Sequence, residues 1–416
     1  MKSSFYRRVD CRLCGGRDLR LVFSLNPTPP ANAFLNKPDL VNEEPVYPLD
    51  LFFCLGCKHV QLLDVVDPEV LFRDYIYVSG TSQSFVDHFD SYASTIISKY
   101  KVQPNSLILD IGSNDGTLLQ KFKDRKMRVL GIDPATDIAS VASDAGIDTW
   151  PLFFSPKVAN EILEKIGHPE VVTANNVFAH SDELSSILSG IKMLLGPNSI
   201  FVFEVSYLLD VFEKNLFDTI YHEHLAYHSV GPLVKFFDDN GLQLIDVERV
   251  DTHGGSLRGV VQLFQGSRDI SSEVAKLCEL ESELGLDVHD SFLEFGLRAK
   301  KNGFKLNKLL TKIRTGGGSI VGFGAPAKST TLLHSYGIDG NILDYIVDDN
   351  PLKQGKYTPG YNIPIKPTEK IYSDFPDYLL VLAWNFADDI ISKLRGQFNK
   401  PVKVVIPLPD LKVVYL

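Results

Sequence analysis

The chain has 416 residues, of which 44% are hydrophobic and 23% charged, a composition typical of globular domains. At roughly 100–200 residues per domain, we expect two to four domains. The formal net charge of −10 disfavours a general nucleic-acid surface, so an anionic ligand would need a local basic site. No apolar run approaches the roughly 18 residues of a membrane span, and no signal peptide is visible. We therefore expect a soluble, cytoplasmic protein.

Four of the five cysteines form two C-x-x-C pairs, Cys11 with Cys14 and Cys54 with Cys57. In a long chain without a secretion signal, this pattern favours a metal over disulfides. Two such pairs complete a tetrahedral Zn²⁺ site, which would be structural because four Cys ligands leave no open position. The segment between the pairs is longer than the roughly 15–20 residues of common zinc ribbons, so four reduced cysteines are the alternative. We predict a small zinc-binding domain over residues 1–80.

Residues 81–270 alternate between strand-like and helical patterns. This alternation predicts an α/β domain with a parallel sheet covered on both faces. Two later strand-like runs, 242–250 and 257–264, flank a turn-like segment and predict an antiparallel hairpin at the sheet edge. The preceding strands are predicted at residues 106–111, 128–132, 171–173 and 199–204.

A Gly-rich loop, IGSNDG, follows the first of these strands and opens a helix. Gly112 would let the backbone approach a ligand at the carboxyl end of the strand. The loop is not the G-x-G-x-x-G of a dinucleotide fold, because Asn114 replaces the second glycine. Asp110 and Asp115 would oppose a pyrophosphate but suit a ligand with ammonium and sulfonium charges. Asp133 follows Asp110 at close to the roughly 20 positions expected of an acid that binds ribose hydroxyls.

The loop and the acid together resemble class I methyltransferases that use S-adenosylmethionine (SAM). The resemblance implies a Rossmann-like domain with SAM as the cofactor, bound at the carboxyl ends of the strands. In such enzymes the segment that corresponds to the one after the predicted strand 171–173 lines the adenine and methyl side of the site. The cofactor-binding residues are accordingly expected to be Asp110, Gly112, Ser113, Asn114, Gly116, Asp133, Asn175 and Asn176.

Histidines and tyrosines cluster in the run YHEHLAYH at residues 221–228, downstream of the strand predicted at 199–204. This position predicts a place near the carboxyl edge of the sheet, where ligands bind in open α/β folds. A carbon nucleophile attacks a sulfonium methyl only after a proton beside a carbonyl is removed and the enolate oxygen is stabilised. Histidine suits the first task, and tyrosine or histidine the second. A metal site and a plain core or surface cluster are the alternatives.

A second α/β unit is predicted over residues 271–416, and it begins with a charged helical stretch at 273–312. Its loop GFGAPAKS contains no acid and carries Lys328, so the loop N–H groups and the lysine favour an anion. Asp348 mimics a ribose-reading acid, which suggests a vestigial dinucleotide fold, with a structural turn as the alternative. The strands of this unit are predicted at residues 319–323, 343–347, 378–382 and 402–406.

The whole chain resembles the nucleotide-sugar C-3 methyltransferases of branched deoxysugar pathways. The resemblance covers nearly all 416 residues. The arrangement of its motifs is specific to that family, although each motif alone is less so. These motifs are the two C-x-x-C pairs, YIYVSG at 75–80, LDIGSNDG at 109–116, YHEH at 221–224, HGGSLR at 253–258 and GFGAPAK at 322–328.

This resemblance implies that a dTDP-linked 4-keto deoxysugar is methylated at C-3 through an enolate. His224 would remove the C-3 proton, with Tyr221 and His222 beside it and Glu223 as their partner. The C-terminal Rossmann-like domain would help to bind the nucleotide sugar between the domains. The residues expected to bind the substrate are Tyr75, Tyr77, His180, His253, Gly324, Ala325 and Lys328.

Three other functions fit parts of the sequence. An O- or N-methyltransferase would use the same SAM-binding architecture on another acceptor atom. A nicotinamide-dependent oxidoreductase would use the loop that begins at Gly322 for its cofactor. A non-enzymatic zinc-ribbon adaptor would use the cysteines alone, but the acidic net charge and the two ligand-binding loops argue against it.

Overall fold

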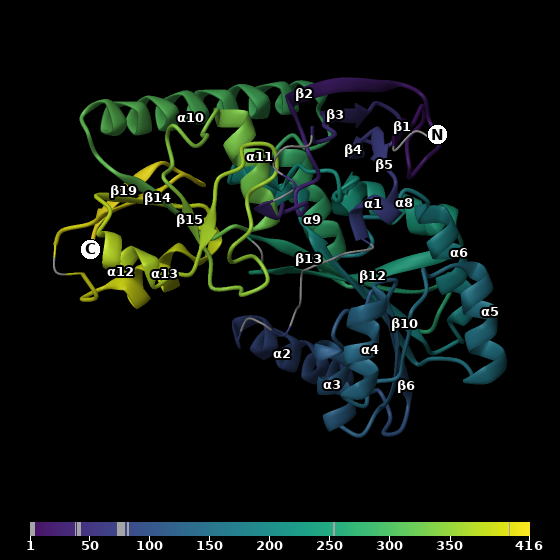
Figure 1. Cartoon of the computed structure of the whole chain (residues 1–416). Coiled ribbons are helices and arrows are strands. Elements are labelled where there is room, and N and C mark those ends of the chain that lie inside the picture. Colours follow the sequence, from purple (N-terminus) through teal and green to yellow (C-terminus); the bar gives the residue numbers. More distant parts are fainter. Residues whose placement is uncertain are drawn as a thin grey trace.

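The computed structural model describes residues 5–37, 39, 43–72, 80, 83–252, 254–398 and 400–416. Three of the predicted substrate contacts, Tyr75, Tyr77 and His253, lie outside these described residues. Within them, the chain forms a small N-terminal β-sheet, a central α/β unit and a C-terminal α/β unit (Figure 1). The predicted α/β fold class with a small cysteine-bearing N-terminal part is confirmed.

The N-terminal sheet is antiparallel and takes one strand from the middle of the chain. Its order is β11-β4-β3-β2, while β1 and β5 form a separate antiparallel pair. The helix α1 (Pro68–Phe72) follows this pair. The strands are β1 (Phe5–Arg7), β2 (Leu19–Thr28), β3 (Tyr47–Cys54), β4 (Val60–Leu62), β5 (Asp64–Val66) and β11 (Ala226–Tyr227).

The strands β2 and β3 have 10 and 8 residues and are the longest of this sheet. The alternating burial of β3 is regular along most of the strand. In β2, register shifts between Leu21 and Phe23 and between Leu25 and Thr28 interrupt the alternation. Because of these irregularities, β2 lacks the regular alternation of apolar and polar residues by which a strand is recognised in a sequence.

The central sheet has seven strands in the order β12-β13-β10-β9-β6-β7-β8. Strands β6 to β10 are parallel, and β13 pairs antiparallel with both β10 and β12. The structure therefore confirms the predicted parallel sheet and its hairpin at one edge. The strands are β6 (Leu107–Ile111), β7 (Arg128–Ile132), β8 (Thr149–Trp150), β9 (Val171–Asn175), β10 (Ile200–Ser206), β12 (Leu242–Val250) and β13 (Ser256–Leu263).

Helices cover both faces of the central sheet. They are α2 (Gln83–Tyr100), α3 (Thr117–Asp124), α4 (Thr136–Asp144), α5 (Pro156–Lys165), α6 (Leu184–Leu194) and α8 (Val230–Asp239), with α7 (Leu208–Glu213) and the short helix η3 (Phe217–Thr219) leading to β11. Successive residues of a strand point to opposite faces. Accordingly, Ile108 of β6 packs with Phe89 of α2 and Phe122 of α3, whereas Leu107 and Leu109 join the core with α5 and α6.

The C-terminal sheet has six strands in the order β16-β15-β14-β17-β18-β19, all parallel except β19. The strands are β14 (Ile320–Phe323), β15 (Ile346–Val347), β16 (Ile365–Lys366), β17 (Tyr378–Val381), β18 (Lys403–Ile406) and β19 (Lys412–Tyr415). The helices of this unit are α11 (Ala327–Tyr336), α12 (Lys370–Asp374), η4 (Trp384–Phe386) and α13 (Ala387–Leu394). The predicted second α/β unit is thus present.

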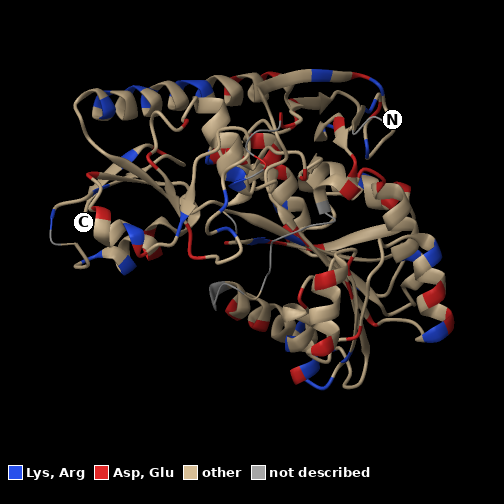
Figure 2. Ribbon diagram, in the orientation of Figure 1, with Lys and Arg blue, Asp and Glu red and all other residues tan. Residues whose placement is uncertain are grey.

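The charged stretch predicted as helical consists of two helices, α9 (Ser272–Glu283) and α10 (His289–Thr315). The segment between the two helices contains Gly285, which has a φ of 76°. Glycine adopts this conformation at little energetic cost because it has no Cβ. The long helix α10 runs along the top of the molecule in Figure 1 and contacts both β2 and β14. Acidic residues lie toward its start and basic residues toward its end (Figure 2), an arrangement that complements the helix dipole.

The N-terminal part also packs directly on the C-terminal unit. The Asn26 side chain donates a hydrogen bond to the His334 carbonyl, and the Thr330 hydroxyl donates one to the Ala31 carbonyl. These bonds tie segments that are far apart in the sequence. Among the described residues, no helix is long and apolar enough to cross a membrane.

Candidate active site and cysteine cluster

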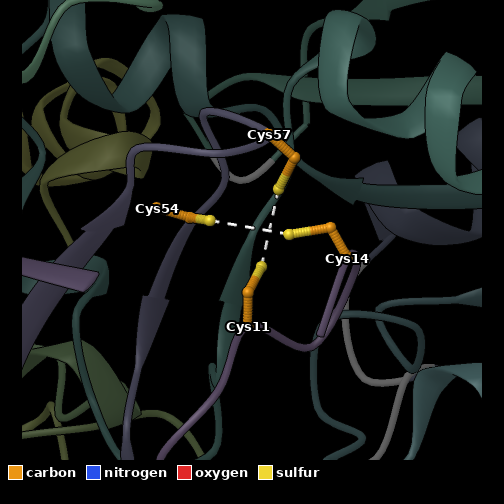
Figure 3. Close-up of side chains that lie close together, drawn as sticks. All are labelled: Cys11, Cys14, Cys54 and Cys57. Atoms are coloured by element: carbon orange, nitrogen blue, oxygen red, sulfur yellow. Dashed lines mark hydrogen bonds between the residues drawn. The ribbon is translucent and has the colours of Figure 1, made fainter. Parts of the chain in front are cut away.

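The four predicted metal ligands come together in the N-terminal part. The sulfur atoms of Cys11 and Cys57 lie 3.5 Å apart, and those of Cys14 and Cys54 lie 3.6 Å apart. All four sulfurs lie within 4.8 Å of one another and point toward a common centre (Figure 3). Zn–S bonds of about 2.3 Å in a tetrahedron place sulfurs roughly 3.8 Å apart, so the cluster fits Zn²⁺.

A cavity of about 370 Å³ opens at the carboxyl ends of β6, β7 and β9. This edge of a parallel sheet is where ligands bind in open α/β folds. Of the predicted cofactor residues, Gly116 alone does not line the cavity; its φ of 76° turns the chain into α3 beside Ile147. The cofactor residues that line the cavity are Asp110, Gly112, Ser113, Asn114, Asp133, Asn175 and Asn176.

Gly112 occupies a position that admits no side chain. Its φ is 72°, and a Cβ built there would lie 2.2 Å from Cγ2 of Val177. Both the backbone conformation and the close approach therefore require glycine. The backbone of the loop is consequently exposed to the cavity instead of being covered by a side chain.

Two buried carboxylates flank this loop. Asp110 accepts a hydrogen bond of 2.6 Å from the Thr173 hydroxyl, and burial raises the pKa of Asp110 to about 7. Asp133 accepts hydrogen bonds from the N–H groups of Asn114 at 2.8 Å and of Ala135 at 2.9 Å. Each oxygen of Asp133 keeps a further lone pair, so the carboxylate can still accept bonds from ribose hydroxyls.

Another polar group of the cavity has no hydrogen bond to the part of the chain that the structure describes. It is the buried hydroxyl of Ser113. Buried polar groups of native proteins are usually hydrogen-bonded. A polar ligand such as the nucleoside and amino-acid groups of SAM would supply the missing partner, so the cavity fits SAM.

His224 lies in a geometry that fixes its tautomer. Its Nδ1 lies 2.8 Å from the Thr219 carbonyl oxygen, which only accepts, so Nδ1 carries the hydrogen. Nε2 then accepts a bond of 2.9 Å from the Tyr221 hydroxyl. Burial lowers the pKa of His224 to about 4, so the ring is neutral near pH 7. The ring of His180, which lines the cofactor cavity, lies 4.9 Å from that of His224.

The two residues between Tyr221 and His224 contact the N-terminal part of the chain. His222 is fully buried, and its Nε2 lies 3.2 Å from the carbonyl oxygen of Tyr47 in β3. Glu223 is also buried and accepts a 2.7 Å hydrogen bond from the Asn32 amide. The sequence placed His222 beside His224, whereas the structure turns it toward β3.

His228, the last histidine of the cluster, belongs to the core. Its ring stacks on Phe178 and on His59, with ring centroids 5.5 Å apart in both pairs. Among the described residues, the group that could hold a metal ion is the cysteine cluster and includes no histidine. His228 is therefore a core residue, which was one of the alternatives for this cluster. His224 and Tyr221 remain the candidates for acid–base catalysis.

In the C-terminal unit, as in the central unit, an aspartate accepts a hydrogen bond from a backbone N–H group of the Gly-rich loop. The Ala325 N–H donates a 2.6 Å hydrogen bond to Asp348, which also accepts one of 2.8 Å from the Asn350 N–H. Asp133 holds its own loop by the same two kinds of bond. Gly324, with a φ of 83°, lets this loop approach Ala383. The acid thus stabilises the loop in both units.

Lys328 lies beside Trp384 and Asn385 of η4, which follow β17. Its ammonium donates a 2.6 Å hydrogen bond to Asn385 and sits 3.6 Å from the centre of the Trp384 ring. Burial lowers the pKa of Lys328 to about 8, although the charge of Asp218 acts in the opposite direction. Asp218 is buried in η3, in a run of residues that carries no recognisable signal, and the sequence did not single it out.

Family models match three successive parts of the chain. They are described as "Putative zinc binding domain" for residues 11–72, "Methyltransferase domain" for 91–247 and "C-methyltransferase C-terminal domain" for 251–409. The chain is also 33% identical over 405 residues to the C-methyltransferase NovU of Streptomyces niveus, covering 97% of this chain and 96% of that relative. The chain belongs to this C-methyltransferase family.

Solved structures match a smaller share of the chain. Magnesium protoporphyrin IX methyltransferase of Synechocystis PCC 6803 with bound SAM is 15% identical, with a TM-score of 0.32, over 42% of this chain and 78% of that chain. The PH0226 protein of Pyrococcus horikoshii OT3 is 13% identical, with a TM-score of 0.35, over 48% and 96%.

The C-methyltransferase is therefore a SAM-dependent enzyme with a zinc-binding N-terminal domain. Membership of the family excludes the oxidoreductase and adaptor alternatives, and it favours carbon over oxygen or nitrogen as the methyl acceptor. The residues that bind the methyl donor SAM would be those that line the cavity around Gly112. The metal ligands would be the four clustered cysteines.

Proposed function

We propose that this C-methyltransferase methylates C-3 of a dTDP-linked 4-keto deoxysugar through an enolate. The observation that carries the proposal is the neutral, oriented imidazole of His224, with Nε2 facing the Tyr221 hydroxyl at 2.9 Å. An acceptor oxygen or nitrogen needs little activation, whereas a carbon beside a carbonyl needs a base and a partner for the enolate oxygen. His224 and Tyr221 are the two groups that these tasks require.

Bound SAM supplies an electrophilic methyl group on a sulfonium. We propose that the Tyr221 hydroxyl turns from Nε2 of His224 to the C-4 oxygen of the sugar, which frees Nε2 to take the C-3 proton. The electron pair of the C–H bond then forms the C-3–C-4 double bond, and the C-4 oxygen takes the negative charge. The enolate carbon would then attack the methyl group of SAM held in the cavity around Gly112 and Asp133, the electron pair of the C–S bond would stay on sulfur, and the C-4 carbonyl would re-form.

The other predicted roles belong to the same proposal. We assign zinc binding to residues 1–80, SAM binding to 81–270 and nucleotide-sugar binding to 271–416. Lys328 supports the last assignment, because an ammonium has three donors and its bond to Asn385 uses one. Glu223 and His222 would hold the catalytic turn against the N-terminal domain. The proposed substrate contacts are His180, Gly324, Ala325 and Lys328, with Tyr75, Tyr77 and His253 outside the described residues.

Deuterium exchange at C-3 tests the proposed base. The enzyme is incubated in D₂O with dTDP-4-keto sugars and S-adenosylhomocysteine, the demethylated cofactor, and exchange is followed by NMR. The expected result is exchange with the wild-type enzyme and its loss in His224→Ala, which should still bind the cofactor product. Full exchange and turnover in His224→Ala would overturn the assignment, and a product methylated on oxygen or nitrogen would overturn the proposed reaction.

A further inference from the structure

Arg12 lies between two zinc ligands, in the knuckle Cys11-Arg12-Leu13-Cys14, yet its side chain points into the protein. The guanidinium side chain is 0% exposed. The Arg12 backbone N–H donates a 3.0 Å hydrogen bond to the Gln61 side chain of β4, and Nη1 donates to the same oxygen at 3.2 Å. A buried charge is tolerated only when it is paired and hydrogen-bonded, so the partners of this guanidinium determine its role.

One partner is the wall of the cofactor cavity. Nε of Arg12 donates a 2.9 Å hydrogen bond to Asp182, and Nη2 lies 2.9 Å from the same oxygen. Asp182 lines the cavity together with its neighbours Ser181 and Glu183. The Arg8 side chain also pairs with Asp182 at 3.1 Å. The N-terminal domain therefore holds this part of the cavity rim through two arginines.

The other partner is the backbone that follows His224, just before β11. Nη1 of Arg12 donates hydrogen bonds to the carbonyl oxygens of Leu62 and Leu225, the residue directly after His224. The Leu62 N–H donates to the same Leu225 oxygen at 3.0 Å. In turn, the Leu225 N–H donates to the Ala179 carbonyl at 2.9 Å, next to His180. One guanidinium thus joins the zinc knuckle, the cavity rim and the backbone beside the proposed base.

We propose that Arg12 is a positioning residue, through which the zinc knuckle holds the SAM cavity and the His224 segment in their working geometry. A planar guanidinium with five donors can reach acceptors on three segments at once, which the point charge of a lysine cannot do. The knuckle fixes the backbone of Arg12, and the side chain transmits that position. The part of the proposal that concerns His224 rests on the proposed function, whereas the part that concerns the cavity does not.

The conservative variant Arg12→Lys tests the proposal. The expected result is unchanged zinc content, a fall of roughly tenfold or more in affinity for S-adenosylhomocysteine by calorimetry, and a higher KM for SAM. A merely structural arginine would lower the melting temperature and leave the affinity of the folded protein unchanged. Binding of S-adenosylhomocysteine needs no sugar, so the result is independent of the acceptor and of the base.

Two further variants complete the experiment. Arg17→Lys changes an exposed arginine next to the same knuckle and should leave affinity and zinc content unchanged. Asp182→Asn reaches the contact from the cavity side, should weaken cofactor binding with zinc retained, and decides the matter if Arg12→Lys does not fold. The double variant should lose less binding free energy for S-adenosylhomocysteine than the two single variants lose together, because each substitution removes the same contact between Arg12 and Asp182. Wild-type affinity in every one of the two single variants that folds would overturn the proposal.

Discussion

The indole nitrogen of Trp384 donates a 2.6 Å hydrogen bond to Asp218, which joins the C-terminal domain to the residue before Thr219. The Thr219 carbonyl in turn holds Nδ1 of His224 at 2.8 Å. The same indole lies under the ammonium of Lys328 and leaves no room for a side chain at Gly254. Trp384 therefore links the proposed nucleotide-binding loop to the carbonyl that fixes the tautomer of the proposed base.

Replacing Trp384 with phenylalanine should slow proton removal more than it weakens cofactor binding. The variant leaves the buried Asp218 carboxylate without its donor, a loss of about 1–3 kcal/mol. We expect a lower melting temperature, C-3 deuterium exchange reduced at least several-fold and unchanged affinity for S-adenosylhomocysteine. Trp150→Phe, on the far edge strand of the central sheet, is the matched control and should keep the exchange rate. Equal exchange in the Trp384 variant and the wild type would contradict the link.

The buried histidines should make the folded state less stable in mild acid. Burial lowers the pKa of both His222 and His228 to about 4, whereas an unfolded chain protonates histidine near pH 6.5. Between these values the unfolded state binds more protons, so each ring costs up to about 1.4 kcal/mol per pH unit below 6.5. Urea unfolding at pH 7 and pH 5 measures the effect. A midpoint that stays constant between the two values would contradict it.

The features that could be predicted from the sequence are those whose residues lie close together along the chain. Gly112 and Asp133 directly follow short, mostly apolar strands, so both the loop and its place at the sheet edge follow from local pattern. The cysteine pairs carry a fixed ligand spacing that survives a long insertion. The clustering of the four cysteines and the cavity at the sheet edge were therefore predictable, although Gly116 does not line that cavity.

The features that could not be predicted depend on contacts between residues that lie far apart in the sequence. Asp218 and Trp384 are separated by 166 positions, and Arg12 and Asp182 by 170, so neither pair forms a local pattern. The direction of His222 depends on how the irregular turn at residues 221–224 packs on β3, and such a turn has no periodicity to read. The roles of these residues follow from tertiary packing, and they remain predictions for experiment.

The cysteine cluster should bind zinc and stabilise the N-terminal domain. Cys54→Ser removes one of four ligands from a closed site, so we expect loss of bound zinc and a clearly lower melting temperature. The control is Cys278→Ser, because Cys278 lies in α9, outside the cluster. Metal analysis by mass spectrometry and a thermal melt check both variants. Full zinc content in Cys54→Ser would refute the assigned ligand set.

Gly112→Ala should abolish cofactor binding through a steric clash more than through backbone strain. A Cβ at Gly112 would lie 2.2 Å from Val177, at a φ of 72°. Gly317 has a similar φ of 82°, but a Cβ there would meet nothing within 4 Å, so Gly317→Ala isolates the strain, about 1 kcal/mol. We expect affinity for S-adenosylhomocysteine to fall more than tenfold in Gly112→Ala and to stay unchanged in Gly317→Ala. Adding Val177→Ala should restore part of the lost affinity, and the absence of any rescue would show that the clash is not the cause.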